Sequence, residues 1–309
     1  MTKARRIILV SGSPRSGTTT IGDVLGTSPN AVALYEPMNF HSGDKAISRY
    51  FEIPGAAGFS HAQFDDLVAR MGALKLDLKS GVWPEDKSLR RVAKHLIGGR
   101  SRNSLRKAKW QRNVETIIWK DPIAAFAMRR FVETGQGHAV ITLRSPFAVA
   151  ASFKRMGWSF QLADIFPRLV EANVAPPKGW ENADIADVVT NAALLWAALY
   201  GDQLSLAESH PNAVTVVNLD DVIRDPEQSY KNLFSELDLP WTAQTQTYLD
   251  KLFAQQGDDK DDVPTGHPHS KNRNVSQANQ YWRKVLTEDE IATVEKWTAP
   301  VRERFGVFP

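Results

Sequence analysis

Short apolar runs alternate with amphipathic stretches along this chain. Five runs of aliphatic and β-branched residues have the length of buried parallel strands: Arg6–Ser11, Ala31–Tyr35, Thr116–Trp119, Ala139–Leu143 and Ala213–Leu219. Helical spacing of apolar residues predicts helices at Thr18–Leu25, His61–Arg70, Ser88–Ile97, Pro146–Met156, Ile185–Leu206, Pro226–Glu236, Ala243–Gln255 and Glu288–Phe305. This alternation predicts an α/β fold of three layers, a central, mostly parallel sheet flanked by helices.

The first strand leads directly into a glycine loop. The ten residues from Ser11 to Thr20 read Ser-Gly-Ser-Pro-Arg-Ser-Gly-Thr-Thr-Thr. A strand, a tight loop and a helix start form an anion cradle, because backbone N–H groups and the helix dipole point at one spot. The glycine spacing is that of a P-loop, but Thr18 stands where the nucleotide-binding P-loop has lysine, and the cation is Arg15 inside the loop. The loop therefore predicts a P-loop relative that handles a different phosphate ester.

A second candidate anion site follows the fourth strand. Arg144 ends that strand, Pro146 suits the first turn of the next helix, and Ser152 lies about two turns further on. A guanidinium fork together with a hydroxyl can bind a phosphate of fixed geometry. The alternative is that Arg144 pairs with a carboxylate at a strand end.

Composition excludes several classes of protein. The chain has 309 residues, a net charge of +3 and no cysteine, so disulfides, thiolate metal sites and a cysteine nucleophile are excluded. The small net charge gives no nucleic-acid signature. No apolar stretch approaches the ~20 residues that span a bilayer, and the first strand begins too early for a signal peptide. We therefore expect a cytoplasmic protein without integral membrane association.

The charge is unevenly spread. No acidic residue occurs between Lys87 and Val114, whereas nine arginines and lysines fall between Arg90 and Arg112. Such a stretch is either a solvated helix surface or a cationic rim that attracts an anionic acceptor or a membrane surface.

Three motifs together resemble the sulfotransferases that use 3′-phosphoadenosine 5′-phosphosulfate (PAPS), in particular the bacterial-type branch. The segment Pro14–Thr19 matches the family's opening motif, and Arg144, Pro146 and Ser152 match its second motif in spacing. The third element is a strand, an acidic pair, Asp-Pro-Glu and a helix, found here as Val214–Leu219, Asp220, Asp221, Asp225–Glu227 and Leu233–Leu239. The resemblance implies one sulfotransferase domain over 1–309, with a helical acceptor-side insertion at about 40–115.

The same resemblance assigns the cofactor site. It implies that the loop residues hold the 5′-phosphosulfate, and that two residues of the second motif hold the 3′-phosphate. The loop residues are Arg15, Ser16, Gly17, Thr18 and Thr19, and the others are Arg144 and Ser152. A kinase neutralises a triphosphate with Mg²⁺ and the P-loop lysine, whereas a sulfuryl group carries less charge. Fixed N–H groups and one arginine suffice for it, so no metal is expected.

The acceptor hydroxyl requires a base. Glu36 follows the second strand, and a carboxylate at a strand's carboxyl end faces the ligand crevice of such sheets. Glu36-Pro37 resembles a sulfotransferase motif in which the glutamate is the base, and His41 is the second candidate for the base. The alternative is that Glu36 has a structural role and pairs with Arg15 or Arg144. By resemblance, Lys120 after the third strand stabilises the bridging oxygen; otherwise it forms an ion pair with Asp121 or Glu36.

The tail departs from the family pattern, because the Arg-Lys-Gly loop that closes over the 3′-phosphate is missing. Lys271, Arg273 or Arg283 are the candidates for its role. His267 and His269 flank a proline in a polar loop, which is typical of exposed histidines rather than of a metal site.

The predicted function is transfer of a sulfuryl group from PAPS to an acceptor hydroxyl by in-line displacement. Carbohydrate, lipid and small natural-product acceptors stay open, with anionic and amphiphilic ones among them, and the oligomeric state is open too. One alternative is a P-loop kinase of a nucleotide or small molecule, in which Asp121 would hold Mg²⁺. The other is a non-catalytic module that binds PAP, the product of PAPS, or another phosphorylated ligand.

Overall fold

Five parallel strands form the central sheet in a computed structural model of the chain, which describes residues 5–81, 99–254 and 281–308. The strands are β1 (Arg6–Gly12), β2 (Ala31–Tyr35), β3 (Thr116–Lys120), β4 (His138–Leu143) and β5 (Val214–Asn218). Their order is β2-β3-β1-β4-β5, and every neighbouring pair runs parallel. All five predicted strands are confirmed.

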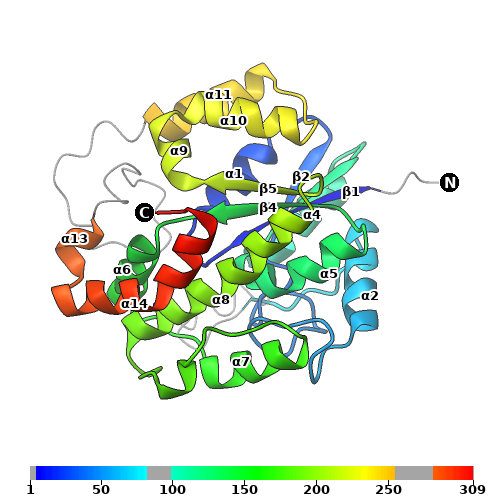
Figure 1. The fold of residues 1–309 in the computed structure, drawn as a ribbon. Helices are drawn as coiled ribbons and strands as arrows, with labels where there is room; N and C mark the ends of the chain where they lie inside the picture. The colour runs from blue at the N-terminus through cyan, green and yellow to red at the C-terminus, as the bar shows by residue number, and fades with distance from the viewer. Residues whose placement is uncertain (1–4, 82–98, 255–280, 309) are drawn as a thin grey trace, which may run out of the picture.

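Helices cover both faces of this sheet, as Figure 1 shows with the sheet seen nearly edge-on. Alternate β1 residues point to opposite faces, so Ile8 and Val10 belong to one buried cluster, and Ile7 and Leu9 to the other. The first cluster packs against α1 (Thr18–Leu25), α10 (Pro226–Glu236) and α11 (Ala243–Ala254). The second packs against α2 (His61–Gly72), α5 (Met128–Glu133), α6 (Pro146–Met156) and α8 (Val188–Ser209). The predicted three-layer arrangement is confirmed.

Several helices that the sequence pattern did not predict complete the structure. They are α4 (Arg100–Trp110), η1 (Pro122–Ala127), α7 (Leu162–Glu171), η2 (Trp180–Asn182), α9 (Leu219–Arg224) and α13 (Trp282–Val285). Helix α7 contains Pro167, which ordinarily argues against a helix interior. The predicted helix at Ser88–Ile97 lies outside the described residues, whereas α14 (Glu288–Phe305) has the predicted bounds.

The layers place the loops that carry the candidate residues at one end of the sheet. Parallel strands share the direction of their carboxyl ends, so the loops after β1, β2, β3 and β4 emerge along the same edge. In the described residues, no helix is long and apolar enough to cross a membrane.

Candidate functional site

The loop after β1 has the conformation of an anion cradle. Gly12 lies against β4: a Cβ there would approach the Thr142 carbonyl oxygen to 2.4 Å, so only glycine fits. Gly17 is the N-cap of α1 and has a left-handed φ of 86°. Among the described residues no side chain caps this helix start, so the N–H groups of its first turn face the loop. An uncapped helix N-terminus behind a tight loop fits a phosphate or a sulfuryl group.

Two residues that sequence reasoning missed support the loop from beneath. The buried Tyr200 hydroxyl of α8 accepts a hydrogen bond from the Ser13 N–H (3.1 Å) and donates one to the Thr142 carbonyl (2.7 Å). The Thr142 hydroxyl shares a 2.6 Å hydrogen bond with that of Ser16. Burial raises the pKa of Tyr200 to about 12, which keeps its proton in place for donation. Tyr200 looks like an ordinary core residue in the sequence, since nothing there marks its contact with a loop 187 residues away.

Ser16 shapes the loop in this structure. Its N–H and its hydroxyl both donate to the Ser13 carbonyl, at 3.0 and 2.6 Å. Both polar groups are therefore used within the loop, while Thr18 is buried and Thr19 is half-buried at the start of α1. The backbone N–H groups of this helix turn remain the groups suited to bind an anion.

The two predicted anion motifs meet. The Arg15 side chain donates from Nε to the Ser152 hydroxyl at 3.2 Å, and the Arg144 guanidinium donates to the Arg15 carbonyl at 2.6 Å. Trp196 of α8 in turn donates its indole N–H to the Arg144 carbonyl at 2.8 Å. Two guanidinium groups from the loops after β1 and β4 thus converge with a hydroxyl of α6, which gives a cationic site beside the start of α1.

A carboxylate lies within electrostatic reach of Arg144. Burial raises the pKa of Asp220, at the start of α9, and the positive charge of Arg144 opposes that rise. The Asp220 Oδ1 atom is buried and has no hydrogen-bond partner within residues 5–81, 99–254 and 281–308. The sequence-based alternative, an arginine beside a carboxylate after a strand, therefore has a concrete candidate in Asp220.

Glu36 and Lys120 form an ion pair at the ends of β2 and β3. The Lys120 ammonium lies 2.6 Å from Glu36 Oε1, and the Asn39 side chain donates to Glu36 Oε2 at 2.9 Å. The Lys120 side chain is 5% exposed and that of Glu36 is 29% exposed. Gly22 of α1 makes room for the lysine stem, because a Cβ there would lie 2.9 Å from Lys120 Cβ. The pair therefore holds a partly open carboxylate at the carboxyl edge of the sheet.

Arg15 and Glu36 also share an uncommon backbone conformation. Their φ angles are 74° and 47°, in the left-handed region that non-glycine residues seldom adopt. Such conformations cost on the order of 1–3 kcal/mol each and persist where the surroundings impose them, commonly at functional sites. The turn after Glu36 is tight as well, since a Cβ on Gly43 would lie 2.3 Å from the Pro37 carbonyl oxygen.

His41, the second candidate base, lies in an aromatic cluster. Its ring centroid is 4.8 Å from that of Phe40 and 5.8 Å from that of Tyr50. Tyr50 also contacts Phe160 edge-on, at 5.7 Å between centroids. Of these half-buried rings, Phe40, His41 and Tyr50 belong to the predicted acceptor-side insertion at about 40–115, and Phe160 lies between α6 and α7.

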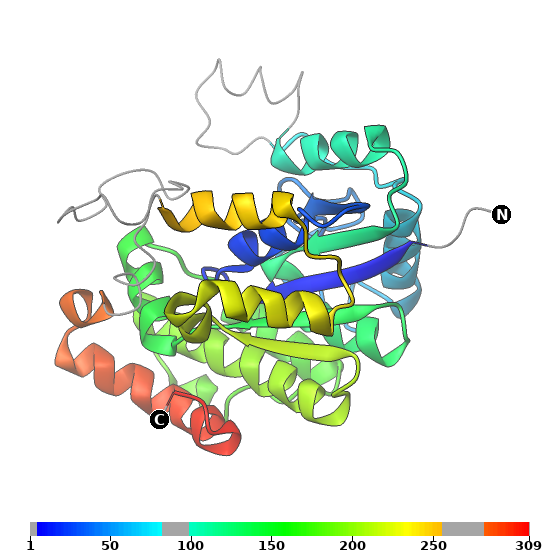
Figure 2. The ribbon, with the colours of Figure 1, turned by 90° about the horizontal axis from the view of Figure 1, so that it is seen from above.

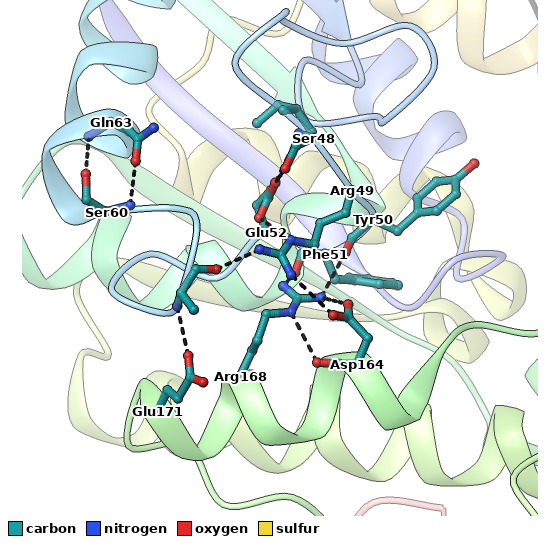
Figure 3. A network of polar contacts seen from close by, with 12 residues as sticks. Ser48, Arg49, Tyr50, Phe51, Glu52, Ser60, Gln63, Asp164, Arg168 and Glu171 are labelled. Atoms are coloured by element: carbon teal, nitrogen blue, oxygen red, sulfur yellow. Dashed lines mark hydrogen bonds and ion pairs between the residues drawn. The ribbon is translucent and has the colours of Figure 1, made fainter.

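A polar network fixes the loop that carries Tyr50 (Figure 3). Arg168 of α7, whose side chain is 4% exposed, donates to the Phe51 and Tyr50 carbonyls at 2.8 and 3.4 Å. It is itself held by Asp164, 2.5 Å away on the same helix. In Figure 3 the Tyr50 ring points away from this network, which leaves it to pack against His41 and Phe160. Buried charge is therefore used here to position an aromatic wall.

Asp121 anchors the turn that presents Glu36. Its fully buried carboxylate accepts hydrogen bonds from the Met38 N–H (2.6 Å), the Trp119 indole (3.3 Å) and the Ile123 N–H (3.0 Å). Burial raises the pKa of Asp121 to about 7, and the nearby negative charge of Glu36 adds to the rise. With three donors already bound, this carboxylate is poorly placed to hold the Mg²⁺ that a kinase would need.

The raised pKa of Asp121 predicts a pH dependence of stability. The folded chain holds this proton more tightly than the unfolded chain, so its contribution falls as pH rises from about 4 to about 7. We expect this fall to be on the order of 4 kcal/mol, and the variant Asp121→Asn to lack it. Urea unfolding of both proteins across this pH range measures it. Parallel pH profiles of wild type and variant would contradict the raised pKa, whatever the offset between them.

Two predicted cofactor residues, Lys271 and Arg273, lie outside the described residues, as do His267 and His269. Arg283 is described and lies in α13, with its guanidinium 4.5 Å from the Trp282 ring centroid. Trp282 stacks on Phe147 at 4.8 Å between centroids, so it anchors α13 to α6.

No protein-family model and no curated protein sequence matches the chain. Several solved structures have a similar backbone fold. The sulfotransferase domain of the curacin biosynthetic pathway is 15% identical, with a TM-score of 0.49 and 99% of each chain covered. Sulfotransferase STF9 from Mycobacterium avium is 12% identical, with a TM-score of 0.48, covering 99% of this chain and 78% of its own.

Retinol dehydratase, solved with retinol and PAP, is 13% identical, with a TM-score of 0.48, covering 100% of this chain and 85% of its own. The first two proteins are sulfotransferases, and the third was solved with PAP bound. Since all three identities are low and all three TM-scores stay below one half, the chemistry of the site rests on the chain's own residues.

Proposed function

We propose that this chain is a PAPS-dependent sulfotransferase that acts on an acceptor hydroxyl. The observation that carries the proposal is the meeting of two anion motifs, Arg15 with Ser152 and Arg144 with the Arg15 carbonyl. PAPS carries two separated anionic groups, a 5′-phosphosulfate and a 3′-phosphate, so it requires two adjacent anion sites. The uncapped start of α1 suits the first group, and Arg144 with Ser152 suits the second.

The residues of the site have distinct parts in this proposal. PAPS supplies the sulfuryl group, while Arg15 and the first-turn N–H groups of α1 stabilise negative charge on the bound anion. Glu36 accepts the proton of the acceptor hydroxyl, and Lys120 and Asn39 hold its carboxylate in a fixed orientation. Lys120 also places a positive charge at this edge of the sheet. His41 lies against Phe40 and Tyr50, where it would contact an apolar part of the acceptor.

The kinase alternative fits these residues less well. Thr18 stands in place of the P-loop lysine, and the candidate Mg²⁺ ligand Asp121 is buried and bound to three donors. A thermal-shift comparison separates the two functions. Stabilisation by PAP without Mg²⁺ supports the proposal, and Mg²⁺-dependent stabilisation by ATP supports a kinase. Incubation with PAPS and extract, followed by a search for a mass gain of one sulfuryl group, distinguishes an enzyme from a binding module.

Arg144→Ala is expected to weaken PAP binding by about 10- to 150-fold, because a charge-assisted hydrogen bond contributes roughly 1.5–3 kcal/mol. Binding of adenosine 5′-phosphosulfate, which lacks the 3′-phosphate, should change far less. Titration calorimetry with both ligands measures the difference. Arg224→Ala, which removes an exposed arginine from α9, is the matched control. Equal losses for the two ligands would contradict the assignment of Arg144.

A further inference from the structure

Helix α4 covers the β2 edge of the sheet, and Figure 2 shows it along the rim of the molecule. Its inward face consists of Ser101, Ser104, Leu105 and Ala108, all buried. The Ser104 hydroxyl accepts from the Tyr35 N–H at 3.1 Å, and the Gln111 side chain donates to the Ala31 carbonyl at 3.1 Å. These bonds satisfy backbone groups at both ends of the edge strand β2 that no neighbouring strand in the described residues pairs with. The structural role of the helix is therefore carried by its inward face.

The outward face of α4 is cationic and carries one large aromatic side chain. Trp110 is 87% exposed, more than any other large apolar side chain among the described residues. Arg106 precedes it by one helical turn, so the two side chains are neighbours on the face opposite the buried serines. Four further exposed cations lie on or next to this helix: Arg100, Lys107, Lys109 and Arg112.

This charge pattern is unfavourable for the helix itself. Arg100 and Arg102 stand in the first turn, where the helix dipole disfavours cations, and no acidic residue offsets them there. Like charges one turn apart also repel each other. Residues 99–114 hold six of the chain's 38 basic residues and none of its 35 acidic ones. The rest of the chain therefore has 32 basic and 35 acidic residues. Arg102 donates to the Leu78 carbonyl at 3.0 Å, but the concentration of like charge as a whole is unfavourable for the helix, which points to a binding partner.

We propose that the outward face of α4 is a docking surface for a membrane that contains anionic lipids. Clustered lysines and arginines are attracted to the negative surface potential of such a membrane. An exposed tryptophan among them adds a ring that favours the interface between headgroups and acyl chains. Nucleic acid is the less suitable partner, because the chain outside residues 99–114 is net acidic. The surface does not depend on the proposed sulfuryl transfer.

Co-sedimentation of the full chain with vesicles tests the proposal without any measurement of activity. We expect binding to vesicles that contain phosphatidylserine and none to vesicles of phosphatidylcholine alone. Raising NaCl from about 0.1 M to about 1 M should release most of the protein, because the Debye length falls from roughly 10 Å to 3 Å. Equal binding to both vesicle types, or no binding to either, would overturn the proposal. So would a DNA or RNA duplex that binds the chain more tightly than the anionic vesicles do.

Substitutions on α4 locate the surface. Each cation contributes roughly five-fold to binding at an anionic membrane, so the double variant Lys107→Glu/Lys109→Glu should bind about 100-fold more weakly or worse. Trp110→Ala should lose about ten-fold. The matched control is Lys178→Glu/Lys251→Glu, which changes two exposed lysines outside α4 and should bind as wild type. A control that loses as much as the α4 variant, or an unaffected Trp110→Ala, would contradict this docking surface. Circular dichroism melting checks that each variant is folded.

Discussion

Glu36→Gln is expected to lower sulfuryl transfer by about 10²–10⁴-fold while PAP binding persists. Glutamine keeps the size of the side chain and an oxygen for the Lys120 ammonium, 2.6 Å away, but it cannot take up the proton of a hydroxyl. The wild-type rate should fall on the acidic side of its pH profile as the carboxylate is protonated, and this limb should vanish in the variant. Steady-state rates across pH, with PAP titrations on both proteins, measure the two effects.

Another glutamate, which is buried, provides the control for this experiment. Glu52 is 1% exposed at its side chain, pairs with Arg49 and lies in the same connection between β2 and α2, but belongs to the network that holds Tyr50. Glu52→Gln should alter stability without removing the acidic limb. A near-normal rate of sulfuryl transfer by Glu36→Gln would mean that His41 or another group is the base.

Arg15→Ala is expected to lower kcat by about 10²–10³-fold and to affect PAPS affinity less. The guanidinium lies inside the loop, held by the Ser152 hydroxyl at 3.2 Å, where negative charge grows as the sulfuryl group departs. Removal of one such preorganised donor costs catalysis more than ground-state binding. Initial rates over a range of PAPS concentrations separate kcat from KM.

The backbone makes this variant interpretable. Arg15 already has a left-handed φ of 74°, so alanine meets the same backbone strain as arginine does. The bond from Arg144 is made to the Arg15 carbonyl, which the substitution keeps. Arg15→Lys, which retains the charge but not the planar fork, shows how much depends on geometry. If kcat survives and only the PAPS KM rises, Arg15 binds the ground state and has no larger part in catalysis.

The sequence predicted the layered sheet because the relevant signals are local. Each buried strand is a short aliphatic run, and α1, α6, α10 and α14 begin and end where caps, prolines and apolar spacing indicate. It missed α7, because Pro167 argues against a helix there, and α4, because basic residues give that segment little apolar character. In both, burial of one face outweighs the local signal.

The chain by itself determined that Arg15, Glu36, Lys120 and Arg144 lie at or just after strand ends, since strand, loop and helix signals lie within a few residues of each. Only the tertiary structure decided which of them meet: Lys120 pairs with Glu36, and Arg144 binds the Arg15 carbonyl. It also brought Tyr200 beneath the glycine loop. The physical reason is that strand order and register, β2 beside β3 and β1 beside β4, are fixed by packing across the whole sheet. Strand order determines which residues at the strand ends come into contact, and no local sequence pattern encodes that order.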